Sequence, residues 1–132
     1  MTADAGIDRA ATGPLANLRV LELATLNAGP TLGAILGDLG ADVVKVEPPG
    51  GDELRVLGPP AGGHARPSLW TLVARNKRVV TLDYKQPDGQ ALLGRMTAVA
   101  DVVVLNQPRP LLERMGCTYE AISARNPRAV VV

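Results

Sequence analysis

The chain has 132 residues, 46% of them hydrophobic and 20% charged, which is the size and composition of one globular domain with one core. Fourteen basic and thirteen acidic residues leave a formal net charge of +1, which excludes a global field that would attract nucleic acid or an anionic membrane. The single cysteine, Cys117, excludes an intramolecular disulfide and a thiolate zinc cluster. We therefore expect a cytoplasmic protein without a metal cofactor.

The N-terminal segment is small and polar. Residues 1–17 lack the basic start and apolar run of a signal peptide, and we expect them to form a flexible tail before a domain of residues 18–132. Charges and prolines interrupt every apolar run well before the roughly eighteen residues of a membrane span. The sequence therefore predicts a soluble protein with no membrane partner.

From residue 18 onward, short apolar runs alternate with segments of helical spacing, a pattern typical of a parallel α/β sheet flanked by helices. The expected strands are residues 18–23, 42–47, 78–83 and 101–105, with a fifth beginning at 129–132. The expected helices start near Pro30 and Pro87 and cover residues 68–75, 110–115 and 119–125. An apolar strand in the last residues favours a truncated chain or a partner chain that covers this edge.

Two details concern the first helix and the long loop. The helix after Pro30 should end just before Gly40, and its apolar residues Leu32, Ile35, Leu36 and Leu39 should share one face. Residues 48–67 contain so much proline and glycine that we expect a loop, and loops of this length are usually functional or disordered.

The turn ATLNAGP between the first strand and the first helix is the place where an open parallel sheet binds its ligand. Main-chain amides at the start of the helix favour an anion there. A dinucleotide fingerprint would need G-x-G-x-x-G in this turn, whereas the sequence has Gly29 and then Gly33 and Gly37 inside the helix. NAD is therefore not expected, and Gly33 and Gly37 are better explained by close packing of the helix on the sheet.

Polar residues also follow the third and fourth predicted strands, at the same edge of the sheet. Arginines, a lysine and side-chain amides would form a rim suited to phosphates and an adenine ring, although a solvated surface would use the same residue types. The rim residues are Leu82, Asp83, Tyr84 and Lys85, then Asn106, Gln107, Pro108 and Arg109, and finally Arg114.

Other candidates carry weaker signals. His64, the single histidine, lies in the proline-glycine loop with no evident partner for a general-base role. Asn76, Lys77 and Arg78 could bind an anion or solvate the start of a strand. Cys117 has no neighbouring histidine, so buried packing explains it better than nucleophilic chemistry.

Five blocks in order resemble the first part of family III CoA-transferases, which include formyl-CoA transferase, carnitine CoA-transferase and 2-methylacyl-CoA racemase. The blocks are LANLRVLELATLNAGP, LGDLGADVVKVEPPGGDELR, NKRVVTLDYKQPDGQALL, ADVVVLNQPRPLLERMGCTYEAI and NPRAVVV. The resemblance covers nearly everything from Leu15 to Val132. It implies a Rossmann-like large domain, of which these residues form the N-terminal portion, and a dimer of interlocked subunits.

The resemblance also implies a coenzyme A site that coincides with the rim. Acyl-CoA and a carboxylic acid would be the substrates, and the implied CoA contacts are Asn27, Ala28, Pro48, Leu82, Asp83, Tyr84, Lys85, Asn106, Gln107, Pro108 and Arg114. Two positions depart from the family pattern. Pro48 stands where an arginine is frequent, and the block Leu105 to Pro110 lacks the usual glutamate, phenylalanine and glycine.

Catalysis in this family uses residues beyond the last block. In the transferases an aspartate attacks the acyl-CoA thioester, and in the racemases a histidine and an aspartate act as bases on the α-carbon. No residue of this sequence matches those positions, so the chain alone is predicted to be inactive. It is interpreted as a fragment, a truncated product, or a non-catalytic subunit whose partner chain supplies the downstream half, with a racemase-like relative as the alternative.

Overall fold

The computed structural model describes residues 12–58 and 67–132, which form a five-stranded sheet in the order β3-β2-β1-β4-β5. Every pair of neighbouring strands is parallel. The strands are β1 (Arg19–Glu22), β2 (Asp42–Glu47), β3 (Lys77–Thr81), β4 (Val102–Val104) and β5 (Val130–Val131). This order is that of a Rossmann-like sheet, in which the direction of the crossovers reverses between β1 and β4.

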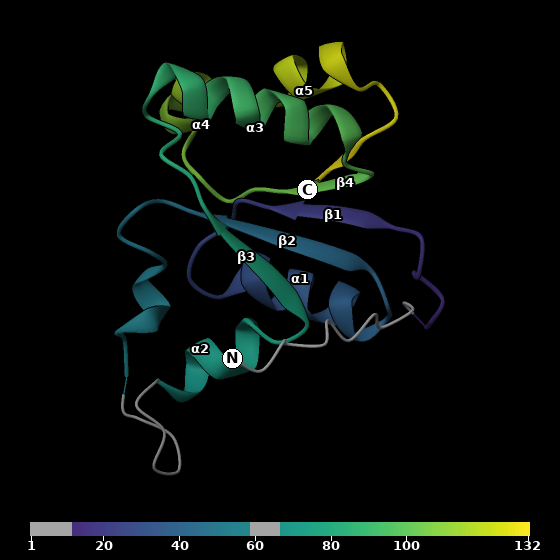
Figure 1. Ribbon diagram of the computed structural model, residues 1–132, viewed down its shortest axis with the longest axis vertical. Helices are drawn as coiled ribbons and strands as arrows, with labels where there is room; N and C mark the ends of the chain where they lie inside the picture. Colours follow the sequence, from purple (N-terminus) through teal and green to yellow (C-terminus); the bar gives the residue numbers. More distant parts are fainter. Residues whose placement is uncertain (1–11, 59–66) are drawn as a thin grey trace, which may run out of the picture.

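Helices cover both faces of the sheet, as Figure 1 shows. One layer contains α1 (Ala28–Asp38) and α2 (Ser68–Val73), and the other contains α3 (Pro87–Val99), α4 (Arg109–Met115) and α5 (Tyr119–Arg125). A short 3-10 helix, η1 (Glu53–Arg55), follows β2. Among the described residues, no helix is long and apolar enough to cross a membrane.

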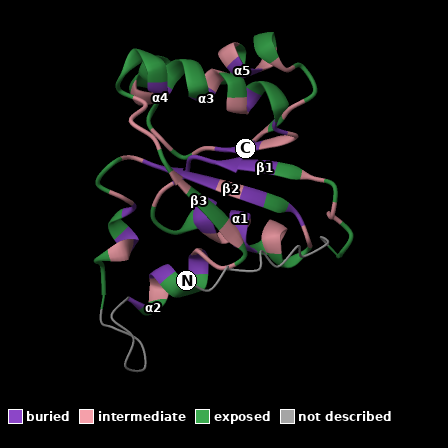
Figure 2. Cartoon of the chain, viewed as in Figure 1, coloured by how far each residue is buried: buried purple, intermediate pink, exposed green. Residues whose placement is uncertain are grey.

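The core is divided by the sheet into two main clusters (Figure 2). The larger cluster joins the sheet to α3, α4 and α5, and it includes Leu93, Val103 and Ile122, each fully buried. The smaller cluster joins the opposite face to α1 and contains Val20, Val43 and other small or β-branched residues. A third cluster, around Leu54, Trp70 and Val73, connects η1 to α2.

The fold class and the element order predicted from sequence are confirmed. The second strand and the last helix have the predicted bounds, and the others differ by a few residues at their ends. The apolar residues of this helix are only partly buried: Leu32 and Leu36 pack against the smaller core cluster, whereas Ile35 and Leu39, the residue that follows α1, are 47% and 42% exposed. The buried side of α1 consists of Gly29, Pro30, Gly33 and Ala34.

Residues 12–17, which belong to the segment expected to form a tail, make a turn against the end of α1. The amide of Leu15 donates to the carbonyl of Leu39 at 3.0 Å, and the Leu15 side chain packs against the smaller core cluster. The division of the chain at residue 17 stays a prediction.

Candidate functional site

The strand register brings the predicted site residues to one edge of the sheet. Glu22, the last residue of β1, lies opposite Lys45 of β2 and Val104 of β4, and Glu47 of β2 lies opposite Thr81 of β3. Because all strands run in the same direction, the segments that follow β1, β2, β3 and β4 all leave the sheet at its carboxyl edge. The residues predicted as CoA contacts lie in these segments, except Ala28, which is the first residue of α1, and Arg114, which is in α4.

The turn after β1 is held by side chains from the end of β4. Asn106 accepts a hydrogen bond from the Thr25 amide at 2.9 Å and donates to the Thr25 carbonyl at 2.7 Å. Gln107 donates through its side-chain amide to the carbonyl of Leu23 and accepts from the amide of Asn106. Both side-chain amides therefore satisfy the backbone of the turn, a role that the sequence did not indicate.

The turn itself has an uncommon backbone. Leu26 adopts φ +63°, a left-handed conformation that costs a non-glycine residue roughly 1–2 kcal/mol. Asn27 and Ala28 come next, both exposed, and the Asn27 side chain accepts a hydrogen bond from the Thr31 hydroxyl at 3.1 Å. Since the first amides of a helix have no partner within the helix, this turn offers donors to an anion at the carboxyl edge.

The segment after β3 brings a lysine to the same edge. The amide of Leu82 donates to the carbonyl of Glu47 at 2.8 Å, which continues the pairing of β3 with β2. Asp83 accepts through its side chain from the amide of Lys85 at 3.1 Å, and the lysine is exposed. Tyr84 is partly buried, and burial raises the pKa of its phenol, with the charge of Asp83 adding to the effect.

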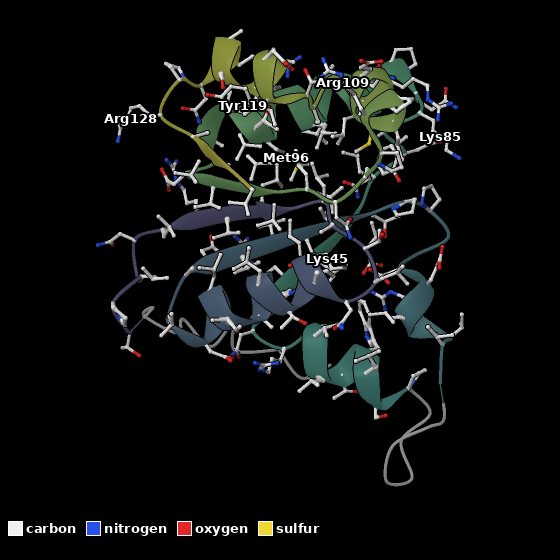
Figure 3. The ribbon with its side chains drawn as sticks, turned by 180° about the vertical axis from the view of Figure 1, so that it is seen from behind. Lys45, Lys85, Met96, Arg109, Tyr119 and Arg128 are labelled. Carbon is white, nitrogen blue, oxygen red and sulfur yellow. The ribbon has the colours of Figure 1, made fainter. Side chains whose placement is uncertain are left out.

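Three cations were predicted at this edge, and they differ in their partners. Arg109 lies 3.0 Å from Glu113 and 3.6 Å from Glu120. Within residues 12–58 and 67–132, neither Lys85 nor Arg114 has a carboxylate within 4.0 Å. Figure 3 shows Lys85 and Arg109 at the end of the molecule opposite Arg128. Lys85 and Arg114 are therefore the cations available to a phosphate at this edge.

A buried ionic cluster lies beneath the turn, and it was missed in the sequence. We define it as Glu22, Lys45, Asp52 and Lys77, whose side chains are at most 1% exposed. The Lys45 ammonium group lies 3.0 Å from Glu22 Oε1 and 2.9 Å from Asp52 Oδ2, and the Lys77 ammonium lies 2.6 Å from Glu22 Oε2. Burial lowers the pKa of Lys77, while Glu22 opposes the shift. The sequence did contain a signal for this cluster, because Glu22 and Lys45 are charged residues between apolar neighbours in the first two predicted strands.

Three glycines of α1 allow close packing against neighbouring residues, and Gly33 makes room for the buried ionic cluster. A Cβ atom on Gly33 would lie 1.9 Å from Glu22 Oε2 and 3.1 Å from Lys77 Nζ. A Cβ on Gly29 would lie 2.1 Å from the Cβ of Ala24. Gly37 likewise approaches the Asn76 carbonyl, to which an added Cβ would come within 2.9 Å. The structure therefore supports close packing as the reason for glycine at 33 and 37.

A third buried carboxylate, Glu47, ends β2 immediately before Pro48. Its oxygens accept from Arg55 at 2.7 and 3.1 Å, and the Arg55 guanidinium lies 4.0 Å from the centre of the Trp70 ring. These contacts connect three elements, because Glu47 belongs to β2, Arg55 to η1 and Trp70 to α2. Pro48 itself is half-buried and continues into the loop.

The remaining candidates lie elsewhere. Asn76 and Arg78 are at the opposite edge of β3, where they donate to Asp38 and Asp42. Cys117 is fully buried, and burial raises the pKa of its thiol to about 11. His64 lies outside the described residues. In the part of the chain that the structure describes, no three His, Cys, Asp or Glu side chains are grouped to hold a metal ion.

The family comparison and the sequence comparison both match CoA-transferases. Residues 15–132 match CoA-transferase family III. Succinate–glutarate CoA-transferase of Agrobacterium fabrum is 42% identical over 123 residues, which cover 89% of this chain and 31% of that protein. The beta subunit of succinyl-CoA–L-malate CoA-transferase of Chloroflexus aurantiacus is 39% identical over 122 residues, covering 92% of this chain and 30% of that subunit.

A solved structure shares the fold. A CAIB/BAIF family protein from Brucella suis superposes with a TM-score of 0.84 at 41% identity, over 90% of this chain and 32% of that chain. The chain therefore spans just under a third of the length of the relatives that it matches.

Proposed function

The chain belongs to CoA-transferase family III, and from that premise we propose that the carboxyl edge of its sheet binds the CoA part of an acyl-CoA. The proposal is carried by one observation. The turn at the start of α1 and the exposed Lys85, which has no carboxylate partner among the described residues, both lie at the edge where parallel sheets bind ligands. The family's substrates are acyl-CoA and a carboxylate, and the phosphates of CoA need such donors.

Different parts of the edge would contact different parts of CoA. Lys85 and Arg114 would pair with phosphates, since both are exposed and cationic. The amides at Asn27 and Ala28 would bind a further anionic oxygen at the start of α1. Asn106 and Gln107 would contribute by holding the turn, because their side chains already bind its backbone.

The full reaction is proposed for the whole protein, in which CoA moves from an acyl-CoA to a carboxylic acid. Relatives named as CoA-transferases support transfer rather than racemisation. The aspartate that the resemblance implies as nucleophile lies outside these 132 residues, so we expect the chain alone to bind CoA without exchanging it. Chain mixed with succinyl-CoA and glutarate should form no glutaryl-CoA, and turnover would contradict this part of the proposal.

A multi-chain assembly is the second part of the proposal. The similarity to a beta subunit supports an arrangement in which another polypeptide, or a second copy, completes the site. Sedimentation of the purified chain should show a dimer or a complex, and a monomer at all concentrations would contradict a homodimer.

Calorimetric titration with CoA tests the proposed site directly. Lys85→Ala and Arg114→Ala should each weaken binding about fivefold, corresponding to the ~1 kcal/mol of an exposed ionic contact. Arg128→Ala is the matched control, because Arg128 is an exposed arginine at the opposite end of the molecule, and it should leave the affinity unchanged (Figure 3). NADH binding equal to CoA binding, or equal effects of all three variants, would refute the proposal.

A further inference from the structure

Lys45 reaches from the middle of the sheet to the backbone of the proposed CoA-binding turn. Its ammonium group is buried and donates to the main-chain carbonyl of Ala24 at 2.8 Å and to Glu22 Oε1 at 3.0 Å. Ala24 is the second residue after β1, so this hydrogen bond holds the turn where it leaves the sheet. Figure 3 shows Lys45 between the sheet and the layer that contains α1.

Lys77 makes the corresponding contact on the far side of the turn. Its ammonium group donates to the carbonyl of Pro30, in the first turn of α1, and to Glu22 Oε2, both at 2.6 Å. Glu22 therefore fixes both ammonium groups, one with each carboxylate oxygen. The backbone from Ala24 to Pro30 is fastened at its two ends by lysines from neighbouring strands.

The buried ionic cluster has a formal charge of zero, because two lysines face two carboxylates. It therefore adds little long-range attraction for an anionic ligand. It is also a weak explanation for stability, since well-packed apolar residues often replace a buried ion pair without loss. What an apolar side chain could not supply is the donor for the Ala24 carbonyl.

We infer that Lys45 is a positioning residue, which holds the Ala24 carbonyl and so keeps the turn in the conformation that presents Asn27 and Ala28 to CoA. This inference rests on the proposed function of that turn. The hydrogen bonds to Ala24 and Pro30 also explain how Leu26 keeps a positive φ, because a strained residue persists when the backbone on both sides of it is fixed.

The test separates positioning from stability through Asp52, which contacts Lys45 but not the turn. Lys45→Met leaves the Asp52 carboxylate buried without a cation, whereas Lys45→Met/Asp52→Asn removes that charge. The double variant should therefore unfold at a higher urea concentration than Lys45→Met. Neither variant can donate to the Ala24 carbonyl.

The two readouts are CoA affinity and hydrogen exchange of the Thr25 amide in the free chain. We expect the double variant to bind CoA about tenfold more weakly than wild type, which corresponds to about 1.4 kcal/mol. Exchange at Thr25 should accelerate at least about tenfold, since its hydrogen bond to Asn106 depends on the turn's position. Leu93→Ala is the control, because Leu93 is fully buried in the larger core cluster and its truncation destabilises the chain without removing a hydrogen bond of the turn.

The outcomes are distinct. Leu93→Ala should bind CoA within about twofold of wild type while it is folded. Wild-type affinity and wild-type Thr25 exchange in the double variant would overturn the inference, because Lys45 would then serve stability alone. If wild type itself fails to bind CoA, the proposed function fails, and unchanged Thr25 exchange would still overturn the positioning of the turn by Lys45.

Discussion

Replacing Gly33 by alanine should destabilise the chain, although alanine is the better helix former. Gly33 lies inside α1, where alanine would stabilise an unhindered helix by about 1 kcal/mol. The new Cβ would lie 1.9 Å from Glu22 Oε2 and 3.0 Å from its Cδ, so the carboxylate has to move away from the two lysines. Disrupting a buried ion pair costs about 3–5 kcal/mol. The difference predicts a net loss of about 2–4 kcal/mol.

Gly94 provides the matched control within α3. A Cβ there would meet only the Arg125 side chain, at 3.8 and 3.9 Å, so Gly94→Ala should stabilise the chain by about 0.5–1 kcal/mol. Urea unfolding monitored by circular dichroism and by the fluorescence of buried Trp70 measures both variants. A Gly33→Ala variant as stable as Gly94→Ala would refute the close approach of Glu22 to α1.

Three further predictions use other contacts. Asn106→Ala should lower stability by about 1–3 kcal/mol in urea unfolding and weaken CoA binding, because the amide and carbonyl of Thr25 lose their partner; unchanged values for both would contradict this role. Cys117 should not react with Ellman's reagent at pH 8 until the chain unfolds, because the thiol is buried with a pKa of about 11; rapid reaction of the native chain would contradict its burial. Arg19 holds the pKa of Asp101 at about 2, below the ordinary 3.8, so the pair should contribute up to about 1 kcal/mol above pH 4 and lose it as the pH falls toward 2. Asp101→Asn should therefore differ from wild type in urea unfolding more at pH 7 than at pH 2, and an equal difference at both would contradict the pairing.

The fold was predictable because its signals are local. β2 contains Val43, Val44 and Val46, with Gly40 two residues before it and two prolines directly after it, and α5 begins after a threonine whose side chain caps the Ala121 amide at 3.2 Å. Boundaries of this kind depend on neighbours in sequence. The position of the site at the carboxyl edge then followed from the parallel order of the strands.

The large apolar residues of α1 do not form its buried side, and the reason is physical. Hydrophobic periodicity assumes that large side chains face the sheet, whereas α1 lies so close to β1 that glycines and an alanine occupy its buried side. Ile35 and Leu39 are consequently exposed. A short interaxial distance depends on residues of both elements, so the sequence of the helix alone does not determine it.

The support beneath the turn could not be predicted either. Lys45 and Lys77 look like ordinary strand residues, and their common partner Glu22 precedes them by 23 and 55 positions. Asn106 and Gln107 were expected to contact CoA, and the structure shows that their side chains bind the turn instead of projecting free donors. Their contact with CoA stays a prediction, and so do the contacts of Asn27, Pro48, Lys85 and Arg114.

An amide-resolved NMR titration of the chain with CoA tests the central claim most directly. The account predicts shifts concentrated at residues 25–28, 82–85, 106–107 and 114, with none at Arg19, Asp42 or Arg78 on the opposite edge of the sheet. Shifts confined to the opposite edge, or no shifts at saturating CoA, would contradict it.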